Sequence, residues 1–274
     1  MTRVLVTNDD GFLSPGLRLL CNAITRIPGL EVKIVVPEKP QSAGSLAVTL
    51  HKPIRIWRTE IDGLEMNVIS GRPCDAVIYA FSFLGDFDLV LSGVNMGDNT
   101  GLQALLASGT VCSCIYASIA RNVPGIAFSM YLKSYFNPND NVLIRIIEEI
   151  VKFVLEVKDE LEPIAVISIN FPSKIDRNTR ARVCDIADVK FTHDVVRRVD
   201  PRGLEYFWIH GQLLLYPLEH LDTFSLYVDE SIVISGINPR HISVLRRGHD
   251  PDKAMRILSN LCDHVNDVLR ELFR

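Results

Sequence analysis

The sequence lacks the residue patterns that mark several classes of protein. Its six cysteines show no zinc-type paired spacing, and Cys112 and Cys114 stand one residue closer together than the thiols of a redox motif. We therefore expect buried free thiols, as in a protein of a reducing compartment. A long basic stretch is also missing and the net charge is −4, so a nucleic acid duplex is not an expected partner.

The sequence also has no long apolar run. The stretch between Asp98 and Arg121 carries no charge, but its amide and hydroxyl side chains make it too polar for a membrane span. The first residues lead directly into a short strand-like run and lack the apolar core and the cleavage site of a signal peptide. We therefore expect a cytoplasmic protein without a membrane partner.

Short apolar runs alternate with helical patterns along the chain up to Pro172, and 47% of all residues are hydrophobic. Strands are expected at residues 4–7, 32–36, 87–91, 125–130 and 164–170, with extra strands between 48 and 57. Helices are expected from Pro15 behind a Ser14 cap, and at residues 73–83, 108–120 and 143–154. The alternation predicts an α/β protein with a Rossmann-like, doubly wound, mostly parallel sheet that ends near Pro172.

After Pro172 the pattern changes. Residues 189–199 and 204–212 flank Asp200-Pro-Arg-Gly203, which suits a type I turn, so a C-terminal β-hairpin arm is expected. A terminal helix is expected from Asp250-Pro251, with an apolar stripe of Ala254, Leu258, Leu261, Val265, Val268 and Leu272. This stripe fits either core packing or docking onto another subunit. We expect one domain with a Rossmann-like catalytic core, residues 1–175, to which an arm and helix for oligomerisation, residues 176–274, also belong.

Polar side chains follow three of the expected strands. Asp9 and Asp10 come after the first strand, Ser42 after the second and Asn95 after the strand at 87–91. Because ligands bind at the carboxyl ends of parallel strands, we expect these residues at one edge of the sheet. Their oxygens form a hard ligand set that suits Mg²⁺, Mn²⁺ or Ca²⁺, and a cation would also relieve the repulsion between the two carboxylates. Taken alone, however, Asp-Asp-Gly is typical of a turn with a capping acid.

A second group of residues has the composition of a phosphate site. The segment 92–101 supplies glycines for close backbone approach and the amide side chains of Asn95 and Asn99. Ser108-Gly109-Thr110 opens a helix, whose N-terminus suits an anion. The pattern has neither the lysine of a P-loop nor the spacing of a dinucleotide fingerprint. A metal site next to a phosphate site indicates phosphoryl chemistry.

In combination these motifs resemble the SurE family of survival proteins. The resemblance rests on Val4 to Gly11 with Pro15-Gly16, Ser42, Ser92-Gly-x-Asn-x-Gly-x-Asn-x-Gly101, Ser108-Gly-Thr-Val111, Asn170-Phe-Pro172 and the hairpin turn. It implies a divalent-metal-dependent 5′/3′-nucleotidase that binds one ion, Mg²⁺ or Mn²⁺, through Asp9, Asp10, Ser42 and Asn95. It also implies phosphate contacts from Asn99, Ser108, Gly109 and Thr110, nucleoside monophosphate substrates, and a homodimer or homotetramer that exchanges C-terminal elements.

One segment departs from the family pattern. The family's Gly-Thr-Pro-x-Asp stands here as Gly71-Arg-Pro-Cys-Asp75, so that Arg72 replaces a small hydroxyl residue. A contact from Arg72 to substrate phosphate is one consequence we consider.

The expected reaction is attack of water on phosphorus in line with the departing nucleoside oxygen, with Asp9 or Asp10 as proton acceptor. A haloacid-dehalogenase-type phosphatase would instead need two aspartates separated by one residue, and Asp9 and Asp10 are adjacent. The alternative function is a noncatalytic nucleotide or metabolite-phosphate sensor, although a plain anion site would not place two carboxylates beside its ligand. A mainly structural oligomer is a third possibility, since the arm and the terminal helix could serve assembly. The same two elements fit equally well as the subunit contacts of an enzyme.

Overall fold

The computed structural model describes the chain except residues 134–135, 138–139, 162–163, 243–250 and 274, and describes no side chain from 241 to 254. Within the described residues, nine strands form one sheet and two form a separate hairpin. The large sheet contains β1 (Thr2–Thr7), β2 (Leu30–Pro37), β3 (Ile56–Ile61), β4 (Leu64–Ile69), β5 (Leu89–Met96), β6 (Gly125–Met130), β7 (Val166–Phe171), β8 (Ala181–Val183) and β11 (Ile232–Ile237). The hairpin consists of β9 (Asp194–Val199) and β10 (Glu205–His210).

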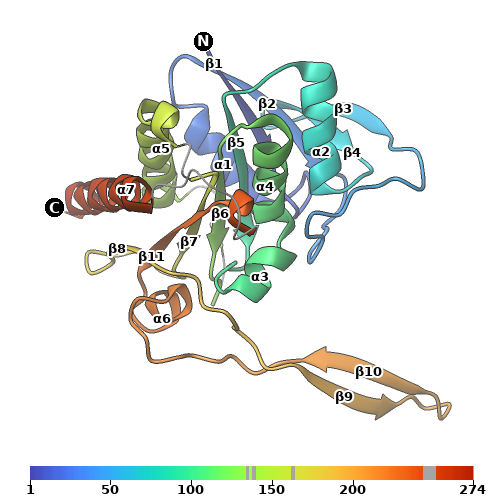
Figure 1. Ribbon diagram of the computed structural model, residues 1–274. Helices are drawn as coiled ribbons and strands as arrows, with labels where there is room; N and C mark the ends of the chain where they lie inside the picture. The colour runs from blue at the N-terminus through green and yellow to red at the C-terminus, as the bar shows by residue number, and fades with distance from the viewer. Residues whose placement is uncertain (134–135, 138–139, 162–163, 243–250, 274) are drawn as a thin grey trace.

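Helices cover both faces of the large sheet (Figure 1). They are α1 (Pro15–Ile24), α2 (Pro73–Tyr79), α3 (Leu102–Ala107), α4 (Gly109–Arg121), α5 (Asn141–Glu156), α6 (Asp222–Tyr227) and α7 (Pro251–Leu272), with short turns η1 (Ala80–Leu84), η2 (Lys158–Glu160) and η3 (Pro239–Ile242). One core cluster joins α1, α5 and α7 to the sheet, and a second joins α2 and α4 to the opposite face. No helix in this described part of the chain is long and apolar enough to cross a membrane.

The strand order of the large sheet is β3-β4-β2-β1-β5-β6-β7-β11-β8. The central strand β1 pairs in parallel with β2 on one side and with β5 on the other. Antiparallel pairs join β3 to β4 and β7 to β11, so the sheet is mostly parallel, as the sequence predicts. The chain reverses its direction of progress between β1 and β5, and in such sheets the ligand crevice lies at the carboxyl ends of those two strands.

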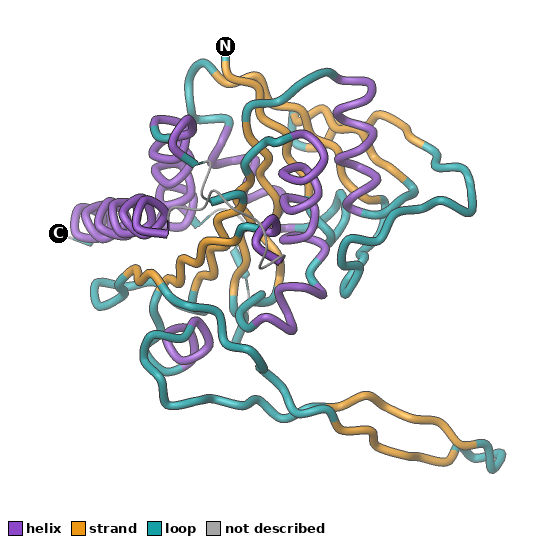
Figure 2. Tube along the Cα trace, viewed as in Figure 1, coloured by secondary structure: helices purple, strands orange, loops and turns teal. Residues whose placement is uncertain are grey.

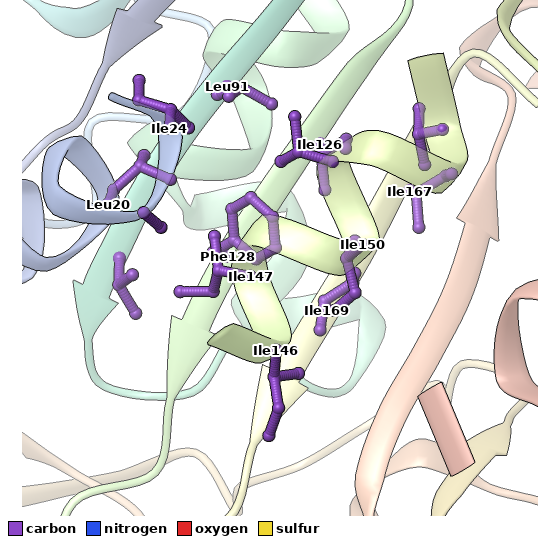
Figure 3. Packing of buried hydrophobic residues seen from close by; sticks show 14 of the residues in the cluster. Leu20, Ile24, Leu91, Ile126, Phe128, Ile146, Ile147, Ile150, Ile167 and Ile169 are labelled. Atoms are coloured by element: carbon purple, nitrogen blue, oxygen red, sulfur yellow. The ribbon is translucent and has the colours of Figure 1, made fainter. Parts of the chain in front are cut away.

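The core explains why the expected helices form where they do. Ser14 caps α1 by accepting a hydrogen bond from Leu17 N, and Pro15 occupies the first helical position. Figure 3 shows side chains of α1 and α5 packed around Phe128 of β6, with the labelled residues Leu20, Ile24, Ile146, Ile147 and Ile150 among them. The 3.6-residue spacing of the apolar residues therefore corresponds to one buried face on each helix.

Two sequence predictions about strands are wrong. The strand expected at residues 87–91 continues to Met96, because the pairing with β6 shifts register between Ser92 and Asn95 and then resumes. Gly93 has φ +122, and a Cβ atom there would lie 2.3 Å from Phe128 O, so only glycine fits this irregularity. Of residues 48–57, only Ile56 and Trp57 belong to a strand, which forms a hairpin through Asp62-Gly63, both at positive φ.

The sheet also continues beyond Pro172, contrary to the prediction. The expected arm segment contributes β8 and β11, and β11 pairs with both β7 and β8. The apolar run Ile232 to Ile234 is fully buried, as a central strand requires. The short helices α3 and α6 are further elements that the sequence reading did not predict.

The terminal helix α7 packs on its own chain. Leu258, Leu261, Val265 and Val268 of the expected stripe are buried in the same core as α5, and Leu272 is half-buried against it. Asp250 and the side chain of Ala254 lie outside the described residues. Of the two interpretations of this stripe, the structure supports core packing.

The predicted arm is present and projects away from the body of the protein (Figures 1 and 2). Its strands pair antiparallel from Glu205 opposite Val199 to His210 opposite Asp194. The turn closes with a hydrogen bond of 3.0 Å from Gly203 N to Asp200 O. All six residues of β10 are exposed, including Trp208 at 64% and Ile209 at 87%.

Candidate active site

Asp9 and Asp10 follow β1 at the switch point of the sheet. The loop that carries them turns at Gly11, which has φ +88, and Asn8 Nδ2 donates a 2.8 Å hydrogen bond to Gly11 O. The loop after β2 is tied to it, because Gln41 N donates to Asp9 O at 2.7 Å. Ser42, which is exposed, is the next residue after Gln41, so this hydrogen bond holds it near Asp9.

Asp9 is buried against the start of α4. Its side chain accepts hydrogen bonds from the hydroxyl and the backbone amide of Thr110. Gly109 permits this approach, since a Cβ atom there would lie 2.8 Å from Asp9 Cβ. Burial raises the pKa of Asp9 to about 6, the Thr110 hydroxyl opposes this rise, and the charge of Asp10 adds to it. Desolvation, and only secondarily the repulsion expected from sequence, therefore perturbs this carboxyl group.

Asp10 links the same loop to the end of β5. Met96 N donates a 2.9 Å hydrogen bond to Asp10 Oδ2, and burial raises the pKa of Asp10. The neighbouring Asn95 is half-buried, and its Nδ2 donates to Gly97 O at 2.7 Å. Gly16 of α1 packs directly on this segment, because a Cβ atom there would lie 1.9 Å from Val94 O.

The donor set fits a hard divalent cation. Among the described residues, no Lys or Arg side chain bonds to Asp9 or Asp10, so two desolvated carboxylates lie together without a compensating charge. Asn8 Oδ1, in the same loop, is buried without a hydrogen-bond partner in this part of the chain. In the described ranges, no group of three or more His, Cys, Asp or Glu side chains is arranged so that it could hold a metal ion by itself. The remaining predicted ligands are accordingly the neutral oxygens of Ser42 and Asn95.

The predicted phosphate-binding residues surround the start of α4 and the end of β5. Ser108 caps α4 by accepting from Val111 N at 3.1 Å, and the Thr110 hydroxyl is engaged with Asp9. Asn99 is buried and donates from Nδ2 to Ser129 Oγ at 2.8 Å. In the first turn of α4, Thr110 N is engaged by Asp9 and Val111 N by Ser108, which leaves the amide of Gly109 at the start of the helix to bind an anion. The phosphate contacts of these four residues stay predictions.

Two residues that hold Asn99 in place were not predicted from the sequence as site residues. Ser129 lies near the end of β6, and Asn170 lies near the end of β7, where its Oδ1 accepts from Asn99 N at 2.7 Å. The rule that polar residues at strand ends line the ligand crevice would have found both.

Arg72 lies close to the predicted phosphate site in the folded protein. It immediately precedes α2, where Arg72 N donates to Asp75 Oδ2 at 2.7 Å. The following residue Pro73 has its Cγ 3.0 Å from the position that a Cβ of Gly109 would occupy. A contact between Arg72 and substrate phosphate stays a prediction.

The chain is similar in sequence to known nucleotidases. The family model described as "Survival protein SurE" matches residues 4–197. The chain is 34% identical to a "5′-nucleotidase SurE" from Pyrobaculum arsenaticum over 273 residues, which cover 97% of this chain and all of the relative. It is 38% identical to the protein of that name from Hyperthermus butylicus over 243 residues, which cover 86% of this chain and 84% of the relative.

The fold has a solved counterpart as well. The crystal structure of the SurE protein from Aquifex aeolicus superposes with a TM-score of 0.68 at 24% sequence identity. The superposition covers 94% of this chain and 99% of the other. This similarity confirms the predicted α/β fold class.

Proposed function

This chain belongs to the SurE family, and we propose that the edge of its sheet around Asp9 and Asp10 is a divalent-metal-dependent nucleotidase site. The chain is a phosphatase of nucleoside monophosphates, the class of enzyme that its archaeal relatives are named for. The family implies a divalent cation, and we propose Mg²⁺ or Mn²⁺ because these ions prefer an all-oxygen ligand set.

The uncompensated pair of buried carboxylates is the observation that carries this proposal. Both side chains lie at the switch point, and each is held by a bond to another element, Asp9 by Thr110 and Asp10 by the amide of Met96. Neither carboxylate caps the helix that follows the turn, because Ser14 caps α1. Two fixed carboxylates of raised pKa instead favour a bound cation as the partner that keeps both ionised.

In the proposed mechanism, the chain's own residues orient the substrate and accept a proton. A divalent cation bound by Asp9, Asp10, Ser42 and Asn95 would supply Lewis-acid activation of the phosphate ester and of the attacking water. The backbone amide of Gly109 and the amide side chain of Asn99 would stabilise the negative charge of the phosphate oxygens. Asp9 and Asp10 are both candidates for the group that accepts the proton of the water.

A phosphate-release assay tests this function against the sensor alternative. The metal-free protein is supplied with Mg²⁺, Mn²⁺, Ca²⁺ or Zn²⁺ and with nucleoside 5′- or 3′-monophosphates of each base. We expect release with Mg²⁺ or Mn²⁺ that stops with a chelator and returns when metal is restored. Binding of these nucleotides without release would support the sensor, and phosphate trapped covalently on Asp9 would overturn attack by water.

We also propose that a second copy of the chain covers the arm. An isolated two-stranded hairpin is marginally stable in water, and this one exposes large apolar side chains on both strands. Val195, Phe207 and Trp208 are each more than half exposed. Contact with a partner subunit, in a homodimer or homotetramer, would bury them.

A cytoplasmic location fits the cysteines. All six are free thiols, and five of them are buried. Such cysteines are usual in a reducing compartment, so we propose that the enzyme acts in the cytoplasm.

A further inference from the structure

A buried ion pair ties the active-site loop to a distant part of the chain. Lys190 Nζ lies 2.5 Å from Asp98 Oδ1, and the two side chains are only 3% and 6% exposed. Tyr227 OH of α6 donates to Asp98 Oδ2 at 2.7 Å, and the Thr100 hydroxyl donates to Oδ1. Both oxygens of Asp98 are therefore occupied by groups that are fixed in the core.

Asp98 occupies a defined place between two predicted site residues. It follows Asn95 by three positions and immediately precedes Asn99, whose backbone N–H is held by Asn170. Just beyond it, Gly101 N donates to Asp222 Oδ2 at 2.6 Å, and Leu102 N donates to Ala187 O at 2.7 Å. The loop 95–101 thus rests on residues 185–227, outside the strands that carry the rest of the site.

Lys190 is at the root of the arm. Its backbone N–H donates to Gln103 Oε1 at 3.3 Å, and its carbonyl oxygen accepts from Leu214 N at 2.8 Å. The same Gln103 oxygen accepts from Phe191 N at 3.2 Å. The segments that lead into and out of the arm therefore meet the active-site loop at Lys190.

The electrostatics agree with a fixed pair. Burial raises the pKa of Asp98, but the charge of Lys190 and three hydrogen bonds outweigh burial, so that the pKa is lowered overall. Buried ion pairs are often no more stabilising than apolar residues of the same size, and their best-attested use is to specify one geometry.

We propose that Lys190 and Asp98 are positioning residues of the nucleotidase, which hold the loop so that Asn95 and Asn99 reach the metal and the phosphate. Neither side chain touches the substrate in this proposal. It rests on the proposed function, because the loop has a catalytic role only if this edge of the sheet is the active site.

The test compares metal binding with stability in three variants. Lys190→Met leaves Asp98 unpaired, Asp98→Asn with Lys190→Met removes both charges, and Tyr227→Phe removes only the hydroxyl. Metal-free proteins are titrated with Mn²⁺ in a calorimeter, and Tm, KM and kcat are measured on the same preparations. Lys152→Met is the matched control, since its ammonium lies 2.5 Å from Glu148 on α5, away from the site.

We expect Lys190→Met to weaken Mn²⁺ binding about tenfold and to raise KM, as loss of a supporting contact typically does at metal sites. The double variant should regain Tm, because no buried charge is left alone, but should keep the weakened Mn²⁺ affinity. Tyr227→Phe should shift the affinity in the same direction by a smaller factor. The control should lose some stability and keep its Mn²⁺ affinity.

A purely structural pair would give a different result. The substitutions would then lower Tm alone. The Mn²⁺ dissociation constant and KM of Tyr227→Phe and of the double variant would stay within twofold of the parent values. This outcome overturns the proposal. If the double variant does not fold, Tyr227→Phe decides. A parent protein that binds Mn²⁺ but releases no phosphate would contradict the nucleotidase function, whereas the Mn²⁺ titrations would still decide the role of the pair.

Discussion

Thr110 controls the charge state of Asp9. Its hydroxyl stabilises the ionised carboxylate, so Thr110→Val should raise the pKa of Asp9 above its value of about 6. We expect the pH below which the metal-free protein loses Mn²⁺ affinity to move upward by about one pH unit, because a hydrogen bond to a charged group contributes about 1.5 kcal/mol or more. Ser113→Ala, one turn further along α4, removes a hydroxyl that bonds Ser92 and the backbone oxygen of Thr110 but not Asp9, and should leave this pH dependence unchanged. An unshifted pH dependence of Mn²⁺ affinity in Thr110→Val would contradict this role.

Asp9 should also make the metal-free protein less stable as pH rises. Its folded pKa of about 6 exceeds the ordinary aspartate pKa of 3.8, so the folded state holds the proton more tightly than the unfolded state. The free energy of unfolding should therefore fall between pH 4 and 6, by about 3 kcal/mol, and level off above that window. Asp9→Asn lacks this dependence. Urea unfolding of both proteins with a chelator measures the free energy of unfolding of the parent relative to Asp9→Asn at each pH. If this difference is flat or grows as pH rises, the raised pKa of Asp9 is refuted.

Residue chemistry predicted the two carboxylates but not what surrounds them. Asp9, Asp10 and Asn95 follow strands in the sequence, and the structure places them at the carboxyl edge as expected. The Asp98 to Lys190 pair joins residues 92 positions apart, and no local pattern indicates which lysine will meet which aspartate. Whether Ser42 binds the metal stays a prediction.

Gly16 shows how one helix fixes the segment that carries the predicted metal ligand Asn95. A Cβ atom in Gly16→Ala would lie 1.9 Å from the backbone oxygen of Val94, which can retreat only if Asn95 moves as well. We expect a loss of about 1–3 kcal/mol in the free energy of unfolding and weaker Mn²⁺ binding. Gly29→Ala is the contrast, since it has φ +82 but no neighbour within 4 Å, and should cost stability without changing Mn²⁺ affinity. Equal Mn²⁺ affinities in both variants would speak against this coupling.

The terminal helix provides a second test at this scale. Leu261 is fully buried in the core shared with α5, so Leu261→Ala should lower the free energy of unfolding by about 2–5 kcal/mol. Met255 on the same helix is 55% exposed, and Met255→Ala should change the free energy of unfolding by less than about 0.5 kcal/mol. Chemical unfolding at several protein concentrations measures both. A cost that appears only at high concentration would mean that the stripe docks onto another subunit.

Periodicity predicted the elements that have one clear buried face. The strand expected at residues 125–130 is β6, and the helix expected at 108–120 is α4 to within one residue at each end. The extension of β5 was missed because glycine normally marks the end of a strand, whereas Gly93 here allows an irregular continuation. The strand β8 has three residues and is too short to show a pattern.

At the scale of the whole molecule, the exposed arm should control assembly. Trp208→Ser with Ile209→Ser removes two of its most exposed apolar side chains, so the oligomer should dissociate to a folded monomer. Sedimentation velocity measures the species present. Arg198→Ser, an exposed charged position on the same hairpin, is the control and should stay oligomeric. Parent protein that is monomeric at all concentrations would exclude a subunit contact through the arm.

In the function proposed for this chain, Asp9 and Asp10 form a metal site that hydrolyses nucleotides. The most direct measurement is phosphate release from a nucleoside 5′-monophosphate by metal-free parent, Asp9→Asn and Asp10→Asn proteins, each with and without Mn²⁺. We predict that the parent releases phosphate only with Mn²⁺, and that either substitution lowers kcat/KM at least ~100-fold, because the metal ion contributes several kcal/mol to the transition state. Release without metal, or undiminished release by both variants, would contradict this function.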